Sequence, residues 1–207
     1  MNRKTWIKGA EYLLVFFFVA VMGNVSLSQN TKTGNTPKLL SDNDYQLFTS
    51  IALEKANYFF YLLNRIANKS TPKDSLNYYI HESDLLFHDS AVMEVKSSAG
   101  RITRRPIVEY LRKLSQLNYS QLKIEVFSAF FVSDLQYVSM KTVGNTKITE
   151  YEGIIAFEQL FEGKRGTEIT YKDKTLKAMR VHVLITESDI GRSWDVLLGD
   201  ILILASA

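Results

Sequence analysis

Residues 84–96 read Asp-Leu-Leu-Phe-His-Asp-Ser-Ala-Val-Met-Glu-Val-Lys, which predicts two short extended segments joined by a polar turn. The segments are 84–88 and 91–96, and Asp89-Ser90 lies between them. Asp and Ser favour turns because their side chains hydrogen-bond to nearby backbone groups. Helix-like spacing precedes this stretch and strand-like spacing dominates after it, so it lies near the change from helices to a sheet.

Apolar residues in the helix-like regions recur every three or four positions, which is the spacing of one buried helical face. The first predicted helix begins after Ser41, which stands three residues before Asp44 as an approximate N-cap pair. The second begins at Thr71-Pro72 and the third at Pro106, because proline is favoured in the first turn. The predicted buried faces are Tyr45, Phe48, Ala52, Ala56, Phe59, Leu63 and Ile66 in the first, Leu76, Tyr79 and Ile80 in the second, and Ile107, Tyr110, Leu111, Leu114 and Leu117 in the third.

From residue 119 onward the apolar spacing changes to two, the period of a β-strand. Strands of this length usually bend, and Gly153 and Gly199 are the expected positions of a bulge or kink. Five strands are predicted, at 121–132, 136–143, 147–161, 174–186 and 193–204. Three helices followed by long antiparallel strands predict an α+β fold, with the helices packed on one face of a strongly curved, mainly antiparallel sheet.

The first 28 residues predict an export signal. A basic start is followed by an apolar run at 13–22, and Ser26 and Ser28 fit the small-residue pattern of a cleavage site before Gln29. The run is shorter than the roughly 20 residues that a spanning helix needs, and an uncleaved anchor is the alternative. We therefore expect a periplasmic or secreted bacterial protein with no stable membrane insertion after cleavage. The expected organisation is a signal peptide at 1–28, a flexible linker at 29–40 and a single domain at 41–207.

Charge and cysteine content argue against several classes of function. The chain holds 25 Lys and Arg against 22 Asp and Glu, and three of the basic residues but only one acidic residue lie in the predicted leader. The predicted mature domain is therefore almost neutral, whereas nucleic-acid or anionic-membrane binding needs a clustered surplus of positive charge. The chain has no cysteine, which excludes disulfides, a thiol nucleophile and a lipid-bearing cysteine.

The central stretch resembles the nuclear transport factor 2-like superfamily, the cone-shaped α+β fold of ketosteroid isomerase and polyketide-cyclase-like proteins. The resemblance rests on the run at 85–94, on Gly100 and on the helix start at 107–111. It implies a strand, an acidic turn, a second strand and a short helix at the centre of the fold. The family usually has four strands after the third helix. Either 136–143 is an added hairpin arm, or one bent strand has been divided in two.

The same resemblance implies a catalytic Asp near the end of the second extended segment, and Val95 occupies that position. Valine cannot accept a proton. Glu94 is adjacent, but strand alternation predicts that it faces the opposite way, as an ordinary strand-edge carboxylate. Glu94 is therefore a weak candidate for a general base, and the isomerase mechanism lacks its expected group.

Two further weak catalytic candidates lie on the last strands. His182 is predicted on the sheet face away from the helices, where a carboxylate such as Asp200 or Asp195 would be needed to make an acid–base pair. Asp200 is predicted to share a face with Val196 and Leu198, so we expect it to be partly buried. Because a buried charge needs a partner, an ion pair with Arg180 is the expected role of Asp200.

No metal or cofactor site is predicted. His81 and His88 are seven residues apart, which is not a metal-binding spacing. The basic residues near the third helix, Lys96, Arg101, Arg104, Arg105, Arg112 and Lys113, are expected to be solvated. The sequence also lacks a phosphate-binding glycine loop and a nucleophile elbow.

The function that the sequence favours is that of an exported non-catalytic module binding a small apolar ligand or a protein partner. In such a fold the cone is the expected pocket. Two alternatives stay open: an isomerase- or cyclase-like enzyme with a non-family acid–base pair, and a structural homodimer formed through Arg180, His182, Leu184 and Asp200 on the open sheet face. The residues predicted to line the cone are Tyr79, Met93, Tyr110, Phe157 and Trp194.

Overall fold

The computed structural model describes residues 40–97 and 99–206. Residue contacts divide the chain into two units, Met1–Pro37 and Lys38–Ala207, and the following description concerns the second. The predicted signal peptide at 1–28 lies outside the described residues, as does all of the predicted linker except Leu40. Within the described ranges, no helix is both long and apolar enough to cross a membrane.

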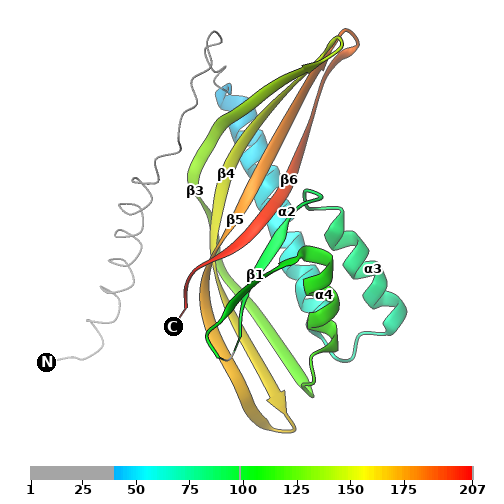
Figure 1. Cartoon of the computed structure of the whole chain (residues 1–207), viewed down its shortest axis with the longest axis vertical. Coiled ribbons are helices and arrows are strands. Elements are labelled where there is room, and N and C mark those ends of the chain that lie inside the picture. Colours follow the sequence, from blue (N-terminus) through cyan, green and yellow to red (C-terminus); the bar gives the residue numbers. More distant parts are fainter. Residues whose placement is uncertain (1–39, 98, 207) are drawn as a thin grey trace, which may run out of the picture. The chain divides into compact units, whose positions relative to one another are not determined.

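Three helices and six strands form the described part of the chain (Figure 1). This confirms the predicted α+β class and its three helices. In chain order the elements are α2 (Asp42–Ala67), α3 (Lys73–Asp84), β1 (Val92–Lys96), β2 (Ile102–Pro106), α4 (Ile107–Gln116), β3 (Gln121–Val143), β4 (Thr146–Arg165), β5 (Glu168–Ser188) and β6 (Gly191–Ser206).

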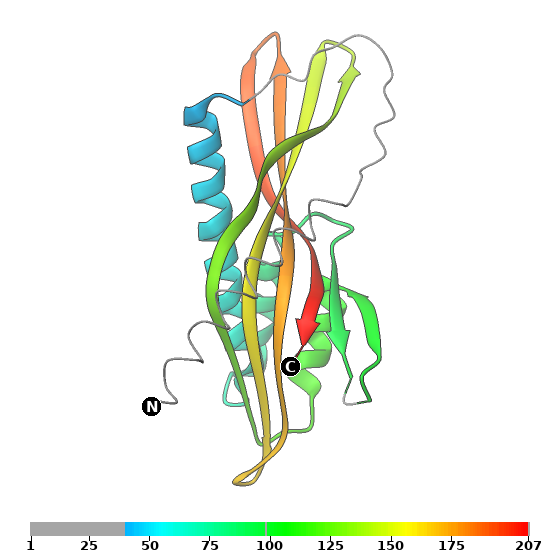
Figure 2. The ribbon, with the colours of Figure 1, turned by 90° about the vertical axis from the view of Figure 1, so that its left-hand side faces the viewer.

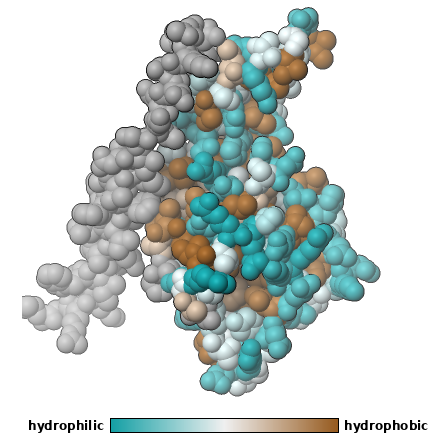
Figure 3. Space-filling view, in the orientation of Figure 1, coloured by the Kyte–Doolittle hydropathy of each residue, from teal (hydrophilic) through white to brown (hydrophobic). Residues whose placement is uncertain are grey.

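The strands form one mixed sheet in the order β2-β1-β6-β5-β4-β3. All neighbours are antiparallel except β1 and β6, which are parallel. The four long strands bend along their length, and α2 runs beside them on one face (Figures 1 and 2). On the side of the molecule drawn in Figure 3, polar and apolar surface is interspersed.

Helix α2 forms as predicted. The Ser41 side chain caps it by accepting a hydrogen bond from the Asp44 backbone N–H at 3.1 Å. Its predicted apolar face is buried at Phe48, Ala52 and Phe59, among others, and packs against the inner face of the sheet. The apolar faces of α3 and α4 join the same core through Ile80 in α3 and through Ile107, Tyr110, Leu111 and Leu114 in α4.

The two predicted strands 121–132 and 136–143 are one bent strand, β3. Its register against β4 shifts several times between Phe127 and Ser139, and Ser128 has a positive φ of 53°. Each shift changes which side chains face the core, so the alternation in the sequence breaks and suggests two strands. With this correction, four strands follow the last helix.

Two local predictions around the central stretch were wrong. Helix α3 continues through Asp84, and of the predicted segment 84–88 only Phe87 makes a β-bridge, to Leu198. Strand β2 lies at 102–106, where the sequence analysis predicts no strand. The apolar pattern of β2 is weak because this edge strand has no fully buried residue.

Gly199 lies in a bulge, as expected for a glycine inside a strand. Val181 pairs with Leu198 and Met179 pairs with Ile201, so Gly199 and Asp200 together face the single residue Arg180. The extra residue inverts the alternation, which puts Leu198 and Ile201 on the same buried inner face. The prediction that Asp200 shares a face with Val196 and Leu198 was therefore wrong.

Gly153 is associated with a bulge in a different strand. Ser133 pairs with Ile154 and Gln136 with Glu152, so the register shift opposite Gly153 belongs to β3. A Cβ atom at Gly153 would lie 2.9 Å from the Leu135 side chain. The glycine therefore makes room for the bulged strand.

Candidate functional site

Strand β1 joins the sheet through a short junction with β6, which we call the seam. Its parallel register contains the single pair Met93 and Ile201. Residues 86–88 add two backbone hydrogen bonds to Leu198, of 2.8 and 2.9 Å. In contrast, β5 and β6 pair along most of their length.

Two carboxylates complete the seam where backbone pairing is lacking. Asp200 Oδ1 accepts a hydrogen bond from the Val92 backbone N–H at 3.0 Å. Glu94 Oε2 accepts one from the Ile203 backbone N–H at 2.9 Å. Hydrogen bonds to ionised acceptors are stronger than neutral ones. Side chains therefore add two hydrogen bonds to the few backbone contacts of the seam.

Glu94 is engaged through both of its oxygens. Its Oε1 atom accepts from Arg104 Nε at 2.9 Å, from the residue directly opposite on β2. Its neighbour Met93 is almost fully buried on the inner face, whereas Val95 is half-buried. Glu94 thus lies in an ion pair and a strand-to-strand hydrogen bond rather than inside the cone.

A lysine that the sequence analysis overlooked lies directly behind the seam. Lys177 is 4% exposed, faces Phe157 on β4 and Ile203 on β6, and its Nζ lies 3.6 Å from the Met93 sulfur. No carboxylate of the described residues is within ion-pair distance of this Nζ. Burial lowers the pKa of Lys177 from 10.5 to about 8, partly opposed by the negative charges of Asp173 and Glu94.

Lys177 has two polar neighbours on the inner face, and the three form what we call the inner polar cluster: Gln159, Thr175 and Lys177. Gln159 is 4% exposed and pairs across the strands with Thr175, whose hydroxyl donates to the Gln159 carbonyl at 3.4 Å. A signal for Lys177 existed in the sequence. Met179, Val181, Val183 and Ile185 form an alternating apolar row on this strand. Lys177 lies two residues before Met179, so the same alternation places it on that face.

The residues predicted to line the cone do not lie together on one accessible surface. Met93, Tyr110 and Phe157 belong to the hydrophobic core, and Met93 and Phe157 are only 1% exposed. Burial also raises the pKa of the Tyr110 hydroxyl. Tyr79 packs at the margin of the core, and its hydroxyl accepts from Arg65 Nη2 at 3.2 Å. Trp194 is 45% exposed and contacts Phe48 edge-on.

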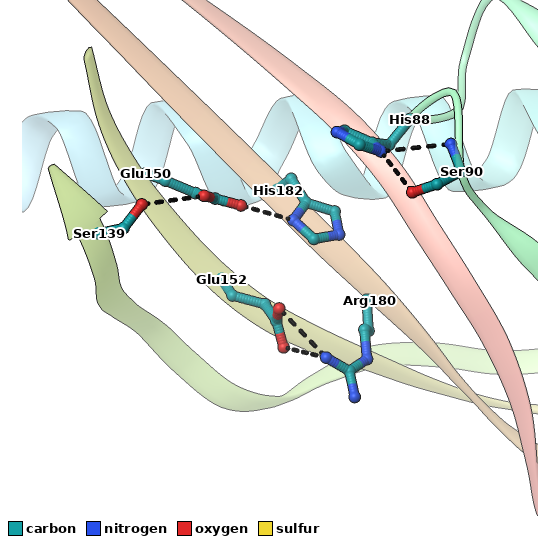
Figure 4. Close-up of polar contacts among 7 residues, drawn as sticks. All are labelled: His88, Ser90, Ser139, Glu150, Glu152, Arg180 and His182. Carbon is teal, nitrogen blue, oxygen red and sulfur yellow. Dashed lines mark hydrogen bonds and ion pairs between the residues drawn. The ribbon is translucent and has the colours of Figure 1, made fainter. Parts of the chain in front are cut away.

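The opposite sheet face carries a row of charged residues across β4 and β5, with α2 behind the strands (Figure 4). Arg180 Nη1 donates to Glu152 Oε1 at 3.0 Å. The predicted Arg180–Asp200 ion pair was wrong, because the bulge turns Asp200 to the Val92 N–H and Glu152 is the acid beside Arg180. The suggested pairing of His182 with Asp200 or Asp195 was also wrong, since Glu150 is its acidic partner.

His182 and His88 meet on this face, although 94 positions separate them in the chain. His182 Nδ1 is 3.1 Å from Glu150 Oε1, and the centroids of the His88 and His182 rings are 5.4 Å apart. His88 Nδ1 lies 3.0 Å from the Ser90 hydroxyl (Figure 4). A Cβ atom at Gly199 would lie 2.5 Å from His182 Nε2, so the missing side chain lets the ring cross β6.

A carboxylate that orients a histidine is an arrangement suited to general acid–base chemistry. The described residues contain no group of three or more His, Cys, Asp or Glu side chains that could hold a metal ion. The His182–Glu150 pair is therefore a candidate proton-transfer group, and the buried amine of Lys177 is a separate candidate on the other side of the sheet.

Two surface depressions lie away from both candidates. One of about 340 Å³ lies between the α2–α3 connection and the ends of β3 and β4, and another of about 170 Å³ lies beside Arg192. Lys69 borders the larger one, but its Nζ donates to the carbonyls of Ser115 and Leu117 and so caps the end of α4. Neither depression is lined by Lys177 or His182.

No protein-family model matches this chain. No curated protein sequence matches it either. Among solved structures, the chain is similar to the crystal structure of a "Putative Scytalone Dehydratase" from Novosphingobium aromaticivorans, with a TM-score of 0.38 and 11% sequence identity over 80% of this chain and 90% of that one. This is a weak likeness of fold alone. The described residues form an α+β architecture with three helices and a six-stranded mixed sheet.

Proposed function

We propose that this chain is an exported member of the nuclear transport factor 2-like superfamily that binds a small, mainly apolar ligand inside the cone without catalysing a reaction. The observation that carries the proposal is the inner polar cluster behind the seam. A core that serves packing alone gains nothing from a buried ammonium group, because removing the charge from water is costly. Ligand sites usually combine a mainly apolar lining with a small number of polar groups.

The seam supports the proposal because it provides a route to a closed interior. Met93 and Phe157 are almost inaccessible, so a ligand must displace part of the cone before it reaches Lys177. The seam is held by few backbone pairs and by the Asp200 and Glu94 carboxylates. Segments with few backbone contacts open locally at the lowest cost in free energy. We therefore place the entry route between β1 and β6.

Calorimetric titration with octanol, dodecanol and hexadecanol tests this proposal. We expect saturable binding of at least one alcohol, together with slower hydrogen exchange at the amides of Met93 and Ile201 in the complex. Asp200→Ala removes one seam acceptor and should speed association, measured by stopped-flow mixing. Glu152→Ala on the opposite face is the matched control and should leave the rate unchanged. Absence of saturable binding to all three alcohols and to the carboxylates of the same length would contradict the proposal.

A proton-transfer enzyme is the second candidate, and the contact between His182 and Glu150 is the specific observation in its favour. Its test is deuterium exchange at carbon atoms next to a carbonyl in a panel of small ketones, followed by NMR. Catalysed exchange that disappears in His182→Gln but persists in Lys177→Met would establish this function and refute the non-catalytic one. The third hypothesis is a dimer formed through the sheet face that carries Arg180. Light scattering over a range of protein concentrations tests it, with Arg180→Glu as the variant.

A further inference from the structure

We infer that the ligand of the cone carries one carboxylate group, which pairs with the Lys177 ammonium while the apolar body of the ligand lies against Met93 and Phe157. This inference rests on the proposed function and adds the chemical class of the ligand. It makes Lys177 a specificity-determining residue.

The first argument is the hydrogen-bonding capacity left on Lys177. An ammonium group has three N–H donors and no acceptor. The single contact recorded for Nζ among the described residues is the Met93 thioether, at 3.6 Å. A thioether is a weak acceptor, so the donors lack a strong acceptor among the residues that the structure describes. An ionised oxygen supplied by a ligand would meet that need.

The second argument is that the nearest acids are not positioned to neutralise this charge. Glu94 and Asp173 influence Lys177 electrostatically, but neither makes an ion pair with it. Both oxygens of Glu94 are already used, one by Arg104 and one by the Ile203 backbone N–H. A carboxylate that reaches Nζ would therefore not displace an existing partner of the lysine.

The third argument is location. Lys177 faces Ile203 across the strands, and the Ile203 backbone N–H is bonded to the Glu94 carboxylate of the seam. The ammonium group therefore lies next to the proposed entry route. The apolar side chains of Met93 and Phe157 lie beside it, and their low polarity strengthens an ion pair formed there. A neutral ligand of the same shape would lack this interaction.

The test compares octanoate, dodecanoate and hexadecanoate with the alcohols of the same length by calorimetric titration of the purified chain at neutral pH. We expect the carboxylate to bind at least about tenfold more tightly than its alcohol, the effect of one charge-assisted hydrogen bond. Lys177→Met should abolish this preference while alcohol binding persists. Lys177→Arg keeps the charge and should keep part of the preference. Lys172→Met, on an exposed position of the same strand, is the matched control and should leave it unchanged.

The outcomes separate this inference from the proposed function. If alcohols and carboxylates bind equally to the unaltered chain, the binding function stands and the carboxylate inference is overturned. If a carboxylate preference exists but persists in Lys177→Met, the inference is also overturned, because another group must supply the charge. If neither series binds, the proposed function fails and this inference fails with it.

Discussion

Removing the buried charge of Lys177 should stabilise the protein at neutral pH. The pKa falls from 10.5 to about 8, and this difference corresponds to about 3 kcal/mol of unfavourable interaction in the folded state. Lys177→Met keeps a flexible side chain of similar length beside Met93 and removes the ammonium group. We therefore expect its free energy of unfolding at pH 7 to exceed that of the parent chain by about 3 kcal/mol.

The pH dependence identifies the cause of this stabilisation. Below pH 8 the lysine is protonated in both folded and unfolded chains, so the penalty is complete. Between pH 8 and 10.5 the unfolded chain binds more protons, so the contribution of this group to stability rises with pH. The difference between Lys177→Met and the parent should thus be largest below pH 8 and shrink towards pH 10.5.

Urea unfolding at a series of pH values from 6 to 10.5 measures this difference, with Lys172→Met as the control for an exposed lysine. The control should stay within about 0.5 kcal/mol of the parent at each pH. A Lys177→Met protein that is less stable than the parent at pH 7, or a difference that does not change with pH, would refute the reasoning. Either result would mean that the ammonium group is satisfied in the folded chain.

Three further changes test the structure by urea unfolding and structure determination. Asp200→Ala should lower the free energy of unfolding by about 1–3 kcal/mol because the Val92 backbone N–H loses its acceptor. A loss of stability below about 0.5 kcal/mol would show that the seam does not need this carboxylate. Gly199→Ala should lower the free energy of unfolding by about 1–3 kcal/mol because its Cβ would overlap the His182 ring. The double variant with His182→Ala should recover most of that stability, and no recovery would contradict the overlap. Ser41→Ala should cost about 1 kcal/mol and increase hydrogen exchange in the first turn of α2, whereas unchanged exchange would show that the cap is dispensable.

The helices could be predicted from the sequence because their stability depends on local spacing. The apolar stripe of α2 and its cap at Ser41 are both visible in consecutive residues, and both are present in the structure. The inward direction of Lys177 was also accessible, because it follows from extending the alternation that ends at Ile185. A lysine in a strand normally indicates an exposed position, so the residue type concealed this inward direction.

The remaining features depend on bulges, which a single sequence barely signals. One extra residue at Gly199-Asp200 inverts the alternation of β6, and this alone overturned the predicted partner of Asp200. The bulges of β3 divided one strand into two apparent ones. The meeting of His88 and His182 requires both the strand order and the space over Gly199, and neither can be read from local spacing.

The seam has one consequence for how this molecule could vary. Backbone hydrogen bonds are the same whatever the residue type, so a junction made from them resists tuning by single substitutions. Here two acidic side chains, Glu94 and Asp200, take over part of that task. Exchanging either one would adjust how readily this end of the sheet separates, in graded steps, while the ladders that join β3, β4, β5 and β6 keep their register.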